Sequence, residues 1–336
     1  MMVDLQQLKI QFLQDQERAQ AFGITLENVN QTLEQRLQIF PAIYPAILHL
    51  CQDDLKLNLN VSAMLWDTWL PLALKLADHR RAANRLLVQG ILGGQGTGKT
   101  TLGRVLTLIL QHLGYRSLSL SLDDLYKTYE DRQALRDRDP RLIWRGPPGT
   151  HDISLGLTIL ERLRDAHPLA EIAVPRFDKS LHGGQGDRTV PELVQGIDIL
   201  LFEGWFVGVQ PIDPAAFLHP PFPIVTEADR TFARDMNTSL QDYLPLWDQL
   251  DLLMVLFPVD YRLSLAWRQQ AEHQLIARGK SGMTDREIEQ FVTYFWKSLH
   301  PELFLPPLIQ SPDRANLVIE INPDHSWGRI YRPGNP

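Results

Sequence analysis

The chain of 336 residues contains very little cysteine, with Cys51 as its single example. One cysteine cannot form a disulfide within the chain, and this composition suits a reducing cytoplasm, which is the location we expect. Cys51 lies in an apolar segment that reads as helical, so we expect it to fill space in the core rather than to act as a nucleophile.

Long apolar runs are missing too. The longest strongly apolar run, at residues 252–259, falls well short of the ~18 residues that a membrane-spanning helix needs. Residues 1–7 lack a basic segment followed by an apolar core, so we expect no signal peptide. We therefore expect no membrane partner.

The sequence also has no excess of positive charge. Its net charge is −7 and its pI is near 5.8, which argues against nucleic acid as the main partner. No Asn-Lys pair occurs, so the chain lacks the Asn-Lys-x-Asp motif with which a GTPase switch reads guanine. Composition leaves the oligomeric state open.

What the chain does have is a phosphate-binding motif directly after the apolar stretch 86–92. It fits G-x-x-x-x-G-K-[ST], in which glycines let backbone N–H groups point at a nucleotide's phosphates. Lys99 would reach the β- and γ-phosphates, Thr100 would hold Mg²⁺, and a helix over 99–113 would direct its positive end at the same anion. The predicted ATP-binding residues are Gly93, Gly94, Gln95, Gly96, Thr97, Gly98, Lys99, Thr100 and Thr101.

From residue 86 onward, apolar strands alternate with helices around the phosphate-binding motif, which predicts an α/β fold of the doubly wound, P-loop type. We expect a mostly parallel five-stranded sheet with helices on both faces. The predicted strands are 86–92, 116–122, 197–202, 252–257 and 317–321.

Residues 1–85 read as a helical N-terminal extension, in which Ser62 caps a helix over 63–80. We expect residues 86–336 to form the domain that carries the phosphate-binding motif, which the resemblance given below implies is a P-loop kinase domain. Within it, 140–190 reads as acceptor-binding loops around a short strand at 172–176, and 260–300 reads as lid helices.

Acidic residues follow two of the predicted strands. Glu203 ends the strand 197–202, where a carboxylate can hold Mg²⁺. Asp123 and Asp124 follow the strand 116–122, and a carboxylate there can take a proton from an attacking hydroxyl. We expect Asp123 to be this base and Asp124 to cap the next helix, and we assign Mg²⁺ to Thr100, Glu203 and Asp123.

The turn-rich loops are rich in cations, which suggests an anionic acceptor. Arg176 is our first choice for binding its carboxylate. The predicted acceptor-binding residues are Asp124, Tyr126, Arg145, His151, Asp152, Arg176, Asp178, Lys179 and Arg188.

A helix opened by Asp260 and stopped by Gly279 carries Arg262, Arg268 and Arg278, which are candidates for a lid over the phosphates. A capping box at residues 284–287 starts the following helix.

Together these motifs resemble the D-glycerate 3-kinase family, a branch of the uridine kinase and phosphoribulokinase-like P-loop kinases. The matching segments are GGQGTGKTT, SLSLDDLY, RGPPGTHD, PRFDKSLHGGQGDR, LLFEGWFVG and WRQQAEHQLIARGKSGMTDREIEQFV. The resemblance implies ATP- and Mg²⁺-dependent phosphorylation of D-glycerate to 3-phosphoglycerate, as in photorespiratory carbon salvage. It implies the catalytic residues Lys99, Asp123, Glu203, Arg268 and Arg278. Residues 1–85 are not shared by the wider superfamily.

Two other functions stay open at this point. The first is another small-molecule kinase of the same superfamily, acting on a nucleoside, pantothenate or a sugar phosphate. A nucleoside acceptor would require an aromatic pocket for its base rather than the four cations of these loops. The second is a non-enzymatic ATP-binding protein that regulates a partner.

Overall fold

The computed structural model describes residues 14–57, 59–165, 167, 169–277, 279 and 282–334. Its centre is a six-stranded sheet of order β10-β9-β8-β1-β7-β2, in which only the β10–β9 pair is antiparallel. The strands of this sheet are β1 (Leu87–Gly93), β2 (Ser117–Ser121), β7 (Ile199–Gly204), β8 (Leu252–Pro258), β9 (Leu317–Ile321) and β10 (Trp327–Tyr331).

Helices surround the sheet. They are α2 (Gln16–Ala21), α3 (Val29–His49), α4 (Val61–Met64), α5 (Leu70–Ala83), α6 (Lys99–His112), α7 (Tyr129–Arg138), α8 (Ile153–Asp165), α9 (Glu227–Ser239), α10 (Leu244–Trp247), α11 (Leu263–Ala277), α12 (Asp285–Ser298), α13 (Pro301–Phe304) and α14 (Pro306–Gln310).

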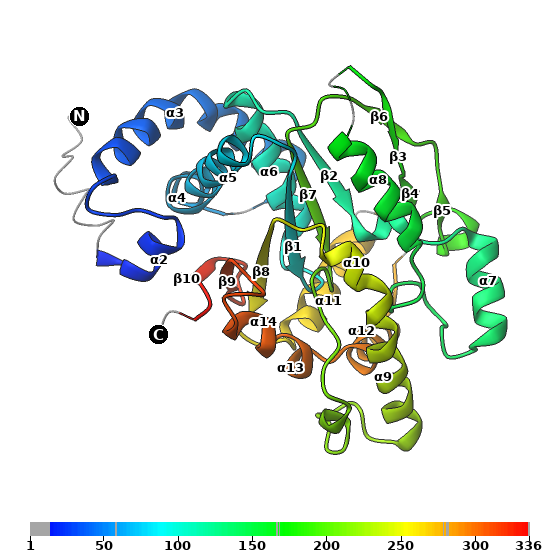
Figure 1. The fold of residues 1–336 in the computed structure, drawn as a ribbon. Helices are drawn as coiled ribbons and strands as arrows, with labels where there is room; N and C mark the ends of the chain where they lie inside the picture. The colour runs from blue at the N-terminus through cyan, green and yellow to red at the C-terminus, as the bar shows by residue number, and fades with distance from the viewer. Residues whose placement is uncertain are drawn as a thin grey trace.

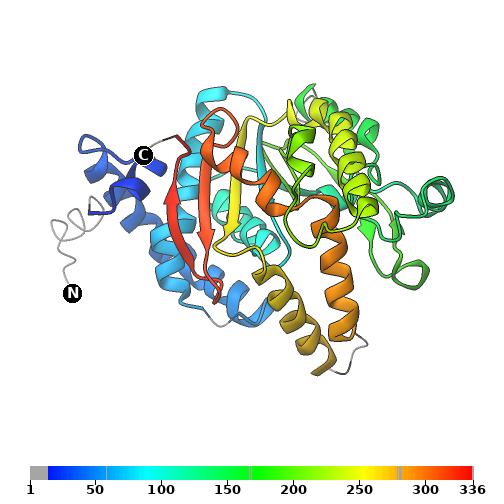
Figure 2. The ribbon, with the colours of Figure 1, turned by 90° about the horizontal axis from the view of Figure 1, so that it is seen from below.

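The two faces of the sheet are covered by different helices, as Figures 1 and 2 show. On one face, apolar side chains of α3, α5 and α6 share a core with the sheet. On the other face, side chains of α8, α9 and α10 form a second core. The predicted α/β class, with helices on both faces and a helical N-terminal region, is therefore confirmed.

All five predicted strands are present, but the predicted number of strands was wrong by one. The sixth strand, β10, pairs with β9 at the edge of the sheet. Its sequence, WGRIY, includes a glycine and an exposed arginine, so it lacks the unbroken apolar run that marks the buried strands. Arg18 donates from α2 to the carbonyl oxygen of Gly328 in β10, at 3.3 Å.

The predicted N-cap at Ser62 was also wrong. Asn60 is the cap, because its side-chain oxygen accepts the backbone N–H of Ala63 at 3.1 Å. The expected helix over 63–80 is divided into α4, a π-helical turn at Leu65–Trp69 and α5. Cys51 is fully buried among apolar side chains, as expected for core filler, and burial raises the pKa of its thiol.

Residues 140–190 contain more regular structure than the loops we predicted. The segment includes helix α8, which the Gly- and Pro-rich flanks obscured although Gly156, Ile159, Leu160 and Leu163 repeat with helical spacing. Its short strand β3 (Ile172–Val174) pairs with β6 (Glu192–Val194). A second pair joins β4 (Phe177–Asp178) and β5 (Asp187–Arg188).

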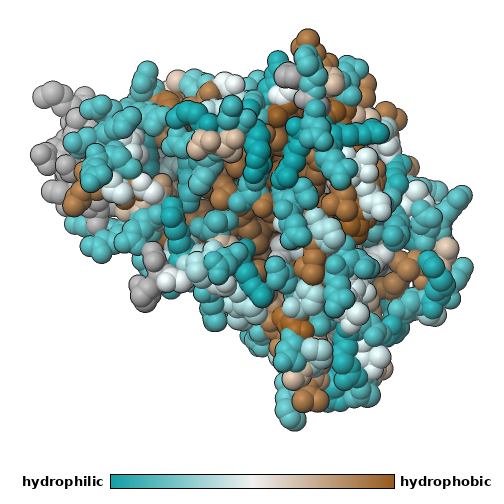
Figure 3. Space-filling model, in the orientation of Figure 1, coloured by the Kyte–Doolittle hydropathy of each residue, from teal (hydrophilic) through white to brown (hydrophobic). Residues whose placement is uncertain are grey.

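Hydrophilic residues cover most of the face seen in Figure 3, and hydrophobic residues appear on it as separate patches. Within the described part of the chain, no helix has the length and apolar character needed to cross a membrane.

Candidate active site

The phosphate-binding loop connects β1 to α6 in the predicted way. Gly98 is in the left-handed region, with φ of +85°, and it precedes the first turn of α6. Gly96 also has positive φ, and a Cβ on it would lie 2.6 Å from the Cβ of Trp267, so a larger residue does not fit there. Thr100 lies exposed in the first turn of α6, where its hydroxyl is accessible to a ligand.

Lys99 folds back onto its own loop. Its Nζ donates to the carbonyl oxygens of Gly93 at 2.7 Å and Gly94 at 3.0 Å. Burial lowers the pKa of Lys99, while the charges of Glu203 and Asp123 oppose this shift. The lysine therefore shares one site with both predicted carboxylates.

Glu203 comes from β7, directly opposite Ser121 of β2. The Ser121 hydroxyl donates a hydrogen bond to the Glu203 carboxylate. Burial raises the pKa of Glu203, and the charge of Lys99 opposes the rise. A half-buried carboxylate that accepts a hydroxyl hydrogen bond and lies near a lysine at the phosphate loop suits a divalent cation.

Asp123 lies in a short 3-10 helix, Leu122–Leu125, that follows β2. The Lys179 ammonium is 2.7 Å from its Oδ2, and the Tyr126 hydroxyl donates to the same carboxylate. Burial alone would raise the pKa of Asp123, but Lys179 and Tyr126 reverse the effect and hold this pKa below its usual value. Asp123 is therefore ionised and able to accept a proton.

Asp124 does not cap the next helix as predicted, because Thr128 takes that role for α7. Its Oδ2 instead accepts the backbone N–H of Ser121 at 3.0 Å, which completes a capping box for the 3-10 helix. The same carboxylate accepts the backbone N–H of Phe177 at 3.2 Å and a guanidinium N–H of Arg176 at 2.9 Å. Asp124 thus joins the end of β2 to the loop that carries Lys179.

Three of the four loop cations predicted to bind the acceptor have carboxylate partners in the protein. Arg176 pairs with Asp124 and Glu192, Arg188 pairs with Asp152, and Lys179 pairs with Asp123.

Arg145 differs from these three. It donates to the carbonyl oxygen of Gly184 at 2.7 Å, and its guanidinium lies 5.9 Å from the Tyr126 ring and 5.6 Å from the Phe177 ring. Among the described residues, no ion pair joins Arg145 to a carboxylate. Its charge is thus available next to Tyr126, which itself contacts Asp123.

His151 is fully buried, and its ring stacks on Tyr126 with centroids 4.6 Å apart. The Tyr243 hydroxyl accepts the Gly149 N–H at 2.9 Å and lies 2.7 Å from His151 Nδ1. The Tyr243 hydroxyl therefore directs its one proton at Nδ1 of His151. Because Nδ1 accepts this hydrogen bond, the imidazole carries its own proton on Nε2. Burial lowers the pKa of His151 to about 3, so the ring is neutral at physiological pH.

Sequence reasoning missed Tyr243, which fixes the His151 tautomer, and Ser121, which holds Glu203. Ser121 could have been found from the Ser-x-x-Asp spacing of a capping box. Tyr243 had no local signal. Asp178 was predicted to bind the acceptor, but its carboxylate accepts from the backbone and hydroxyl of Ser180 in its own turn.

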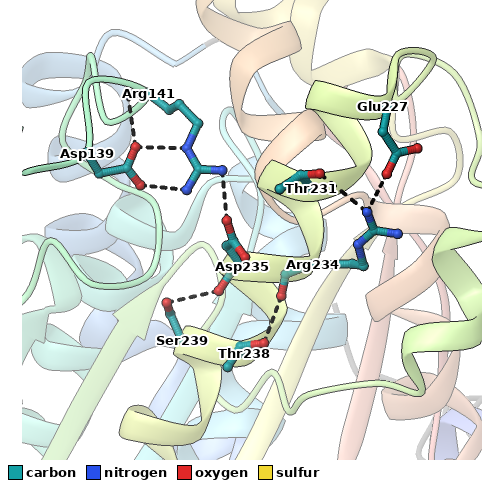
Figure 4. Close-up of polar contacts among 8 residues, drawn as sticks. All are labelled: Asp139, Arg141, Glu227, Thr231, Arg234, Asp235, Thr238 and Ser239. Carbon is teal, nitrogen blue, oxygen red and sulfur yellow. Dashed lines mark hydrogen bonds and ion pairs between the residues drawn. The ribbon is translucent and has the colours of Figure 1, made fainter.

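The loop that carries Arg145 is fixed at its start by Arg141. Figure 4 shows the Arg141 guanidinium between Asp139 and Asp235, at 2.8 Å and 2.7 Å. The carbonyl oxygen of Arg141 accepts the Tyr294 hydroxyl at 3.1 Å. Contacts with α9 and α12 therefore hold this loop in place.

The predicted lid corresponds to α11 and α12. Arg268 forms an ion pair with Glu272 one turn further along α11, and its guanidinium lies 5.7 Å from the Phe291 ring of α12. Arg262 pairs with Asp260 at 3.3 Å. Arg278 lies outside the described residues. The two described arginines thus pair within the protein.

A cavity of about 550 Å³ extends from the phosphate loop toward α11, α12 and α13. Gly93, Gly94 and Gln95 form one end of it. Its remaining wall is mostly apolar and includes the aromatic side chains of Trp205, Phe206, Tyr261, Phe295 and Trp296. The sequence did not predict this aromatic wall beside the phosphate loop.

A phosphate loop on a parallel sheet, with two carboxylates and two lysines around it, defines a P-loop kinase. The chain belongs to the D-glycerate 3-kinase family of these enzymes. It is 30% identical over 330 residues to the chloroplastic D-glycerate 3-kinase of Arabidopsis thaliana, covering 90% of this chain and 69% of that protein. It is 32% identical over 241 residues to a probable ATP-dependent kinase of Saccharomyces cerevisiae, covering 67% of this chain and 80% of that protein.

The fold agrees with this relationship. A solved D-glycerate 3-kinase from Cryptococcus neoformans superposes with a TM-score of 0.68 at 29% identity, covering 77% of this chain and 95% of the other. No protein-family model matches the chain.

Proposed function

We propose that this kinase transfers the γ-phosphoryl group of ATP to the 3-hydroxyl of D-glycerate and produces 3-phosphoglycerate. The observation that carries the proposal is the meeting of Lys99, Asp123 and Glu203 at one edge of the sheet, with Arg145, which has no carboxylate partner among the described residues, nearby. Phosphoryl transfer requires these parts: a cation on the phosphates, a metal-binding acid and a base for the acceptor. The relationship to two D-glycerate 3-kinases supports glycerate as the acceptor.

Lys99 would exchange the carbonyl oxygens of Gly93 and Gly94 for the β- and γ-phosphates when ATP binds. Glu203, Asp123 and the Thr100 hydroxyl are the residues that would hold Mg²⁺. The half-buried Glu203 carboxylate, whose pKa desolvation raises, fits this role because a bound cation would stabilise its charge. The metal would supply neutralisation of the charge that develops on the phosphate oxygens.

Asp123 would orient the acceptor hydroxyl and take its proton. The hydroxyl oxygen forms a bond to the γ-phosphorus while the bond from phosphorus to the bridging oxygen of ADP breaks. Because Lys179 holds the pKa of Asp123 low, the carboxylate is ionised before the acceptor binds. Lys179 also places a positive charge beside the transferred group.

Arg145 is the guanidinium that we assign to the glycerate carboxylate. The sequence favoured Arg176, but that side chain already donates to two carboxylates of the protein. A planar guanidinium without a carboxylate partner can bind glycerate's carboxylate through two parallel hydrogen bonds. Its place beside Tyr126 puts it near the proposed base.

Arg145→Lys tests this assignment, with Arg176→Lys as the matched control. One charge-assisted hydrogen bond contributes ~1.5–3 kcal/mol, so Arg145→Lys should raise the KM for glycerate roughly 10- to 100-fold and leave the KM for ATP nearly unchanged. Glycerate methyl ester, which lacks the negative charge, should be a poor substrate of the wild type. Efficient use of the ester, or a rise in KM only with Arg176→Lys, would contradict the assignment.

The aromatic wall of the 550 Å³ cavity favours a second candidate. An acceptor with an aromatic or larger apolar part, such as a nucleoside or pantothenate, would contact this wall better than glycerate does. ADP release measured over a panel of small hydroxy acids, nucleosides and pantothenate separates the two candidates. A kcat/KM for any nucleoside or pantothenate above that for D-glycerate would reject glycerate as the substrate.

A further inference from the structure

A second cavity, with a volume of about 330 Å³, lies where the turn after α2 meets α3, α5 and the residue that follows β10. This volume is about ten times the ~30 Å³ that one water molecule occupies in the liquid. Its described wall contains no residue of the phosphate loop. The cavity is therefore a separate place from the kinase site.

The described wall of this cavity carries three cations and one carboxylate, and Asp67, which lies outside the wall, partly balances the charge of Arg36. The cations of the wall are Arg36, Lys75 and Arg332, and the wall also contains His79. One carboxylate of the wall, Asp78, is 3.1 Å from Arg81, a residue of α5 outside the cavity. This concentration of cations occurs in a chain whose net charge is −7, and a cavity lined by one sign of charge attracts the opposite ion.

Two of the cations reach the same turn of the backbone from different elements. The Nζ of Lys75, on α5, donates to the carbonyl oxygen of Ala21 at 2.6 Å. Nη2 of Arg332 would lie 3.9 Å from a Cβ built on Gly23. The turn at 21–23 thus brings an ammonium and a guanidinium toward one space between the N-terminal helices and the edge strand.

These groups feel one another's charge. Burial lowers the pKa of Lys75 to about 8, and the positive charge of Arg332 adds to this shift. Burial and the charges of Lys75 and Arg332 lower the pKa of His79. The charge of Asp78 acts in the opposite direction but does not cancel this shift. Cations that repel one another in a cavity are stabilised when an anion enters it.

We propose that this cavity binds the phosphate group of a small phosphorylated metabolite, with Lys75 and Arg332 as the phosphate ligands. The guanidinium supplies a planar fork and the ammonium a point charge, which are the two ways in which side chains bind phosphate oxygens. Thr32 and Gln35 add neutral polar groups to the wall for the rest of the molecule. The ligand would connect α3 and α5 to the chain that follows β10.

Binding is measured by calorimetry on the full chain with its phosphate loop already filled by a non-hydrolysable ATP analogue and Mg²⁺. Inorganic phosphate and glycerol 2-phosphate are the probes. We expect one saturable site per chain, weakened about tenfold or more by Lys75→Met and by Arg332→Ala. Lys56→Met, which removes a charge from an exposed residue outside the cavity wall, should leave binding unchanged.

The absence of saturable binding below about 10 mM would overturn the proposal, because a weaker Kd corresponds to no more than a weak surface attraction. Equal binding in all variants would also overturn it, because Lys75 and Arg332 would then not be the phosphate ligands. Binding of inorganic phosphate with glycerol 2-phosphate at least tenfold weaker would reject a metabolite as the ligand. Circular dichroism and unchanged kinase turnover confirm that the variants are folded, because neither residue belongs to the kinase site.

The pH dependence gives an independent test with sulfate, whose charge does not change between pH 7 and 9. The charged and titratable groups around Lys75 are Arg36 from α3, Asp78 and His79 from α5, and Arg332 after β10. Because the pKa of Lys75 is about 8, sulfate affinity should fall roughly tenfold from pH 7 to pH 9. Lys75→Arg should remove this fall, and an unchanged pH profile in Lys75→Arg would exclude Lys75 as a ligand.

Discussion

Exchanging each of the two neighbouring aspartates for asparagine should separate a catalytic carboxylate from a structural one. Asp124→Asn keeps the size of the side chain but leaves one oxygen where the protein presents three donors. Those donors are the backbone N–H groups of Ser121 and Phe177 and the guanidinium of Arg176, at 3.0, 3.2 and 2.9 Å. The new NH₂ group must face at least one of them.

The magnitude follows from these contacts. The Asp124 side chain is only 15% exposed, so a lost charge-assisted hydrogen bond is not replaced freely by water. One such bond contributes ~1.5–3 kcal/mol, and a donor placed against a donor adds to the loss. We expect Asp124→Asn to lower the free energy of unfolding by about 2–3 kcal/mol and to lower kcat far less than Asp123→Asn does.

Asp123→Asn should show the opposite pattern. This substitution removes the proposed base and its ion pair with Lys179. Because the Lys179 side chain is 62% exposed, the ion pair contributes little, and we expect the free energy of unfolding to change by less than ~1 kcal/mol. Its kcat should fall by roughly 10²–10⁴, with ATP binding nearly unchanged. Urea unfolding and a coupled ADP-release assay measure both quantities on each variant. A larger loss of kcat in Asp124→Asn, at equal stability, would refute the assignment of Asp123.

Three further predictions concern other parts of the molecule. Lys99→Ala should lower turnover by on the order of 10²–10³, because it removes a preorganised cation from the phosphates, and turnover within threefold of wild type would reject this role. Hydrogen exchange over residues 260–290 should slow only when nucleotide and acceptor are both bound, and identical exchange in free and liganded protein would exclude a lid. Burial alone would raise the pKa of Asp229, but hydrogen bonds from Lys297 and Thr226 outweigh this effect and lower the pKa to about 2. The ionised Asp229 therefore stabilises the fold fully above pH ~4, and this stabilisation is lost as the pH falls toward 2. Asp229→Asn should therefore remove about 2 kcal/mol of the acid-dependent loss of stability, and an unchanged acid unfolding curve would contradict this.

The features that depend on near neighbours in the chain could be predicted before the structure was known. The phosphate loop was predicted because its glycines, lysine and threonine lie within nine residues and form their geometry locally. Strands β7 and β8 were predicted because a strand covered on both faces needs an unbroken apolar run, whereas β2 was predicted from leucines that alternate with serines. Glu203 and Asp123 were predicted as neighbours because parallel strands end at the same edge of a sheet, and the structure places both beside Lys99.

The pairing of charges, in contrast, depends on the folded arrangement of distant segments. Arg176 meets Asp124 across 52 residues and Glu192 across 16, and no local pattern indicates either partner. The same holds for Tyr243, which reaches His151 across 92 residues. Edge strand β10 and the cation-lined cavity behind it also depend on where distant segments pack. Hydrogen bonds and ion pairs act over only a few ångströms, so their partners are fixed by the folded arrangement of the chain and not by its order.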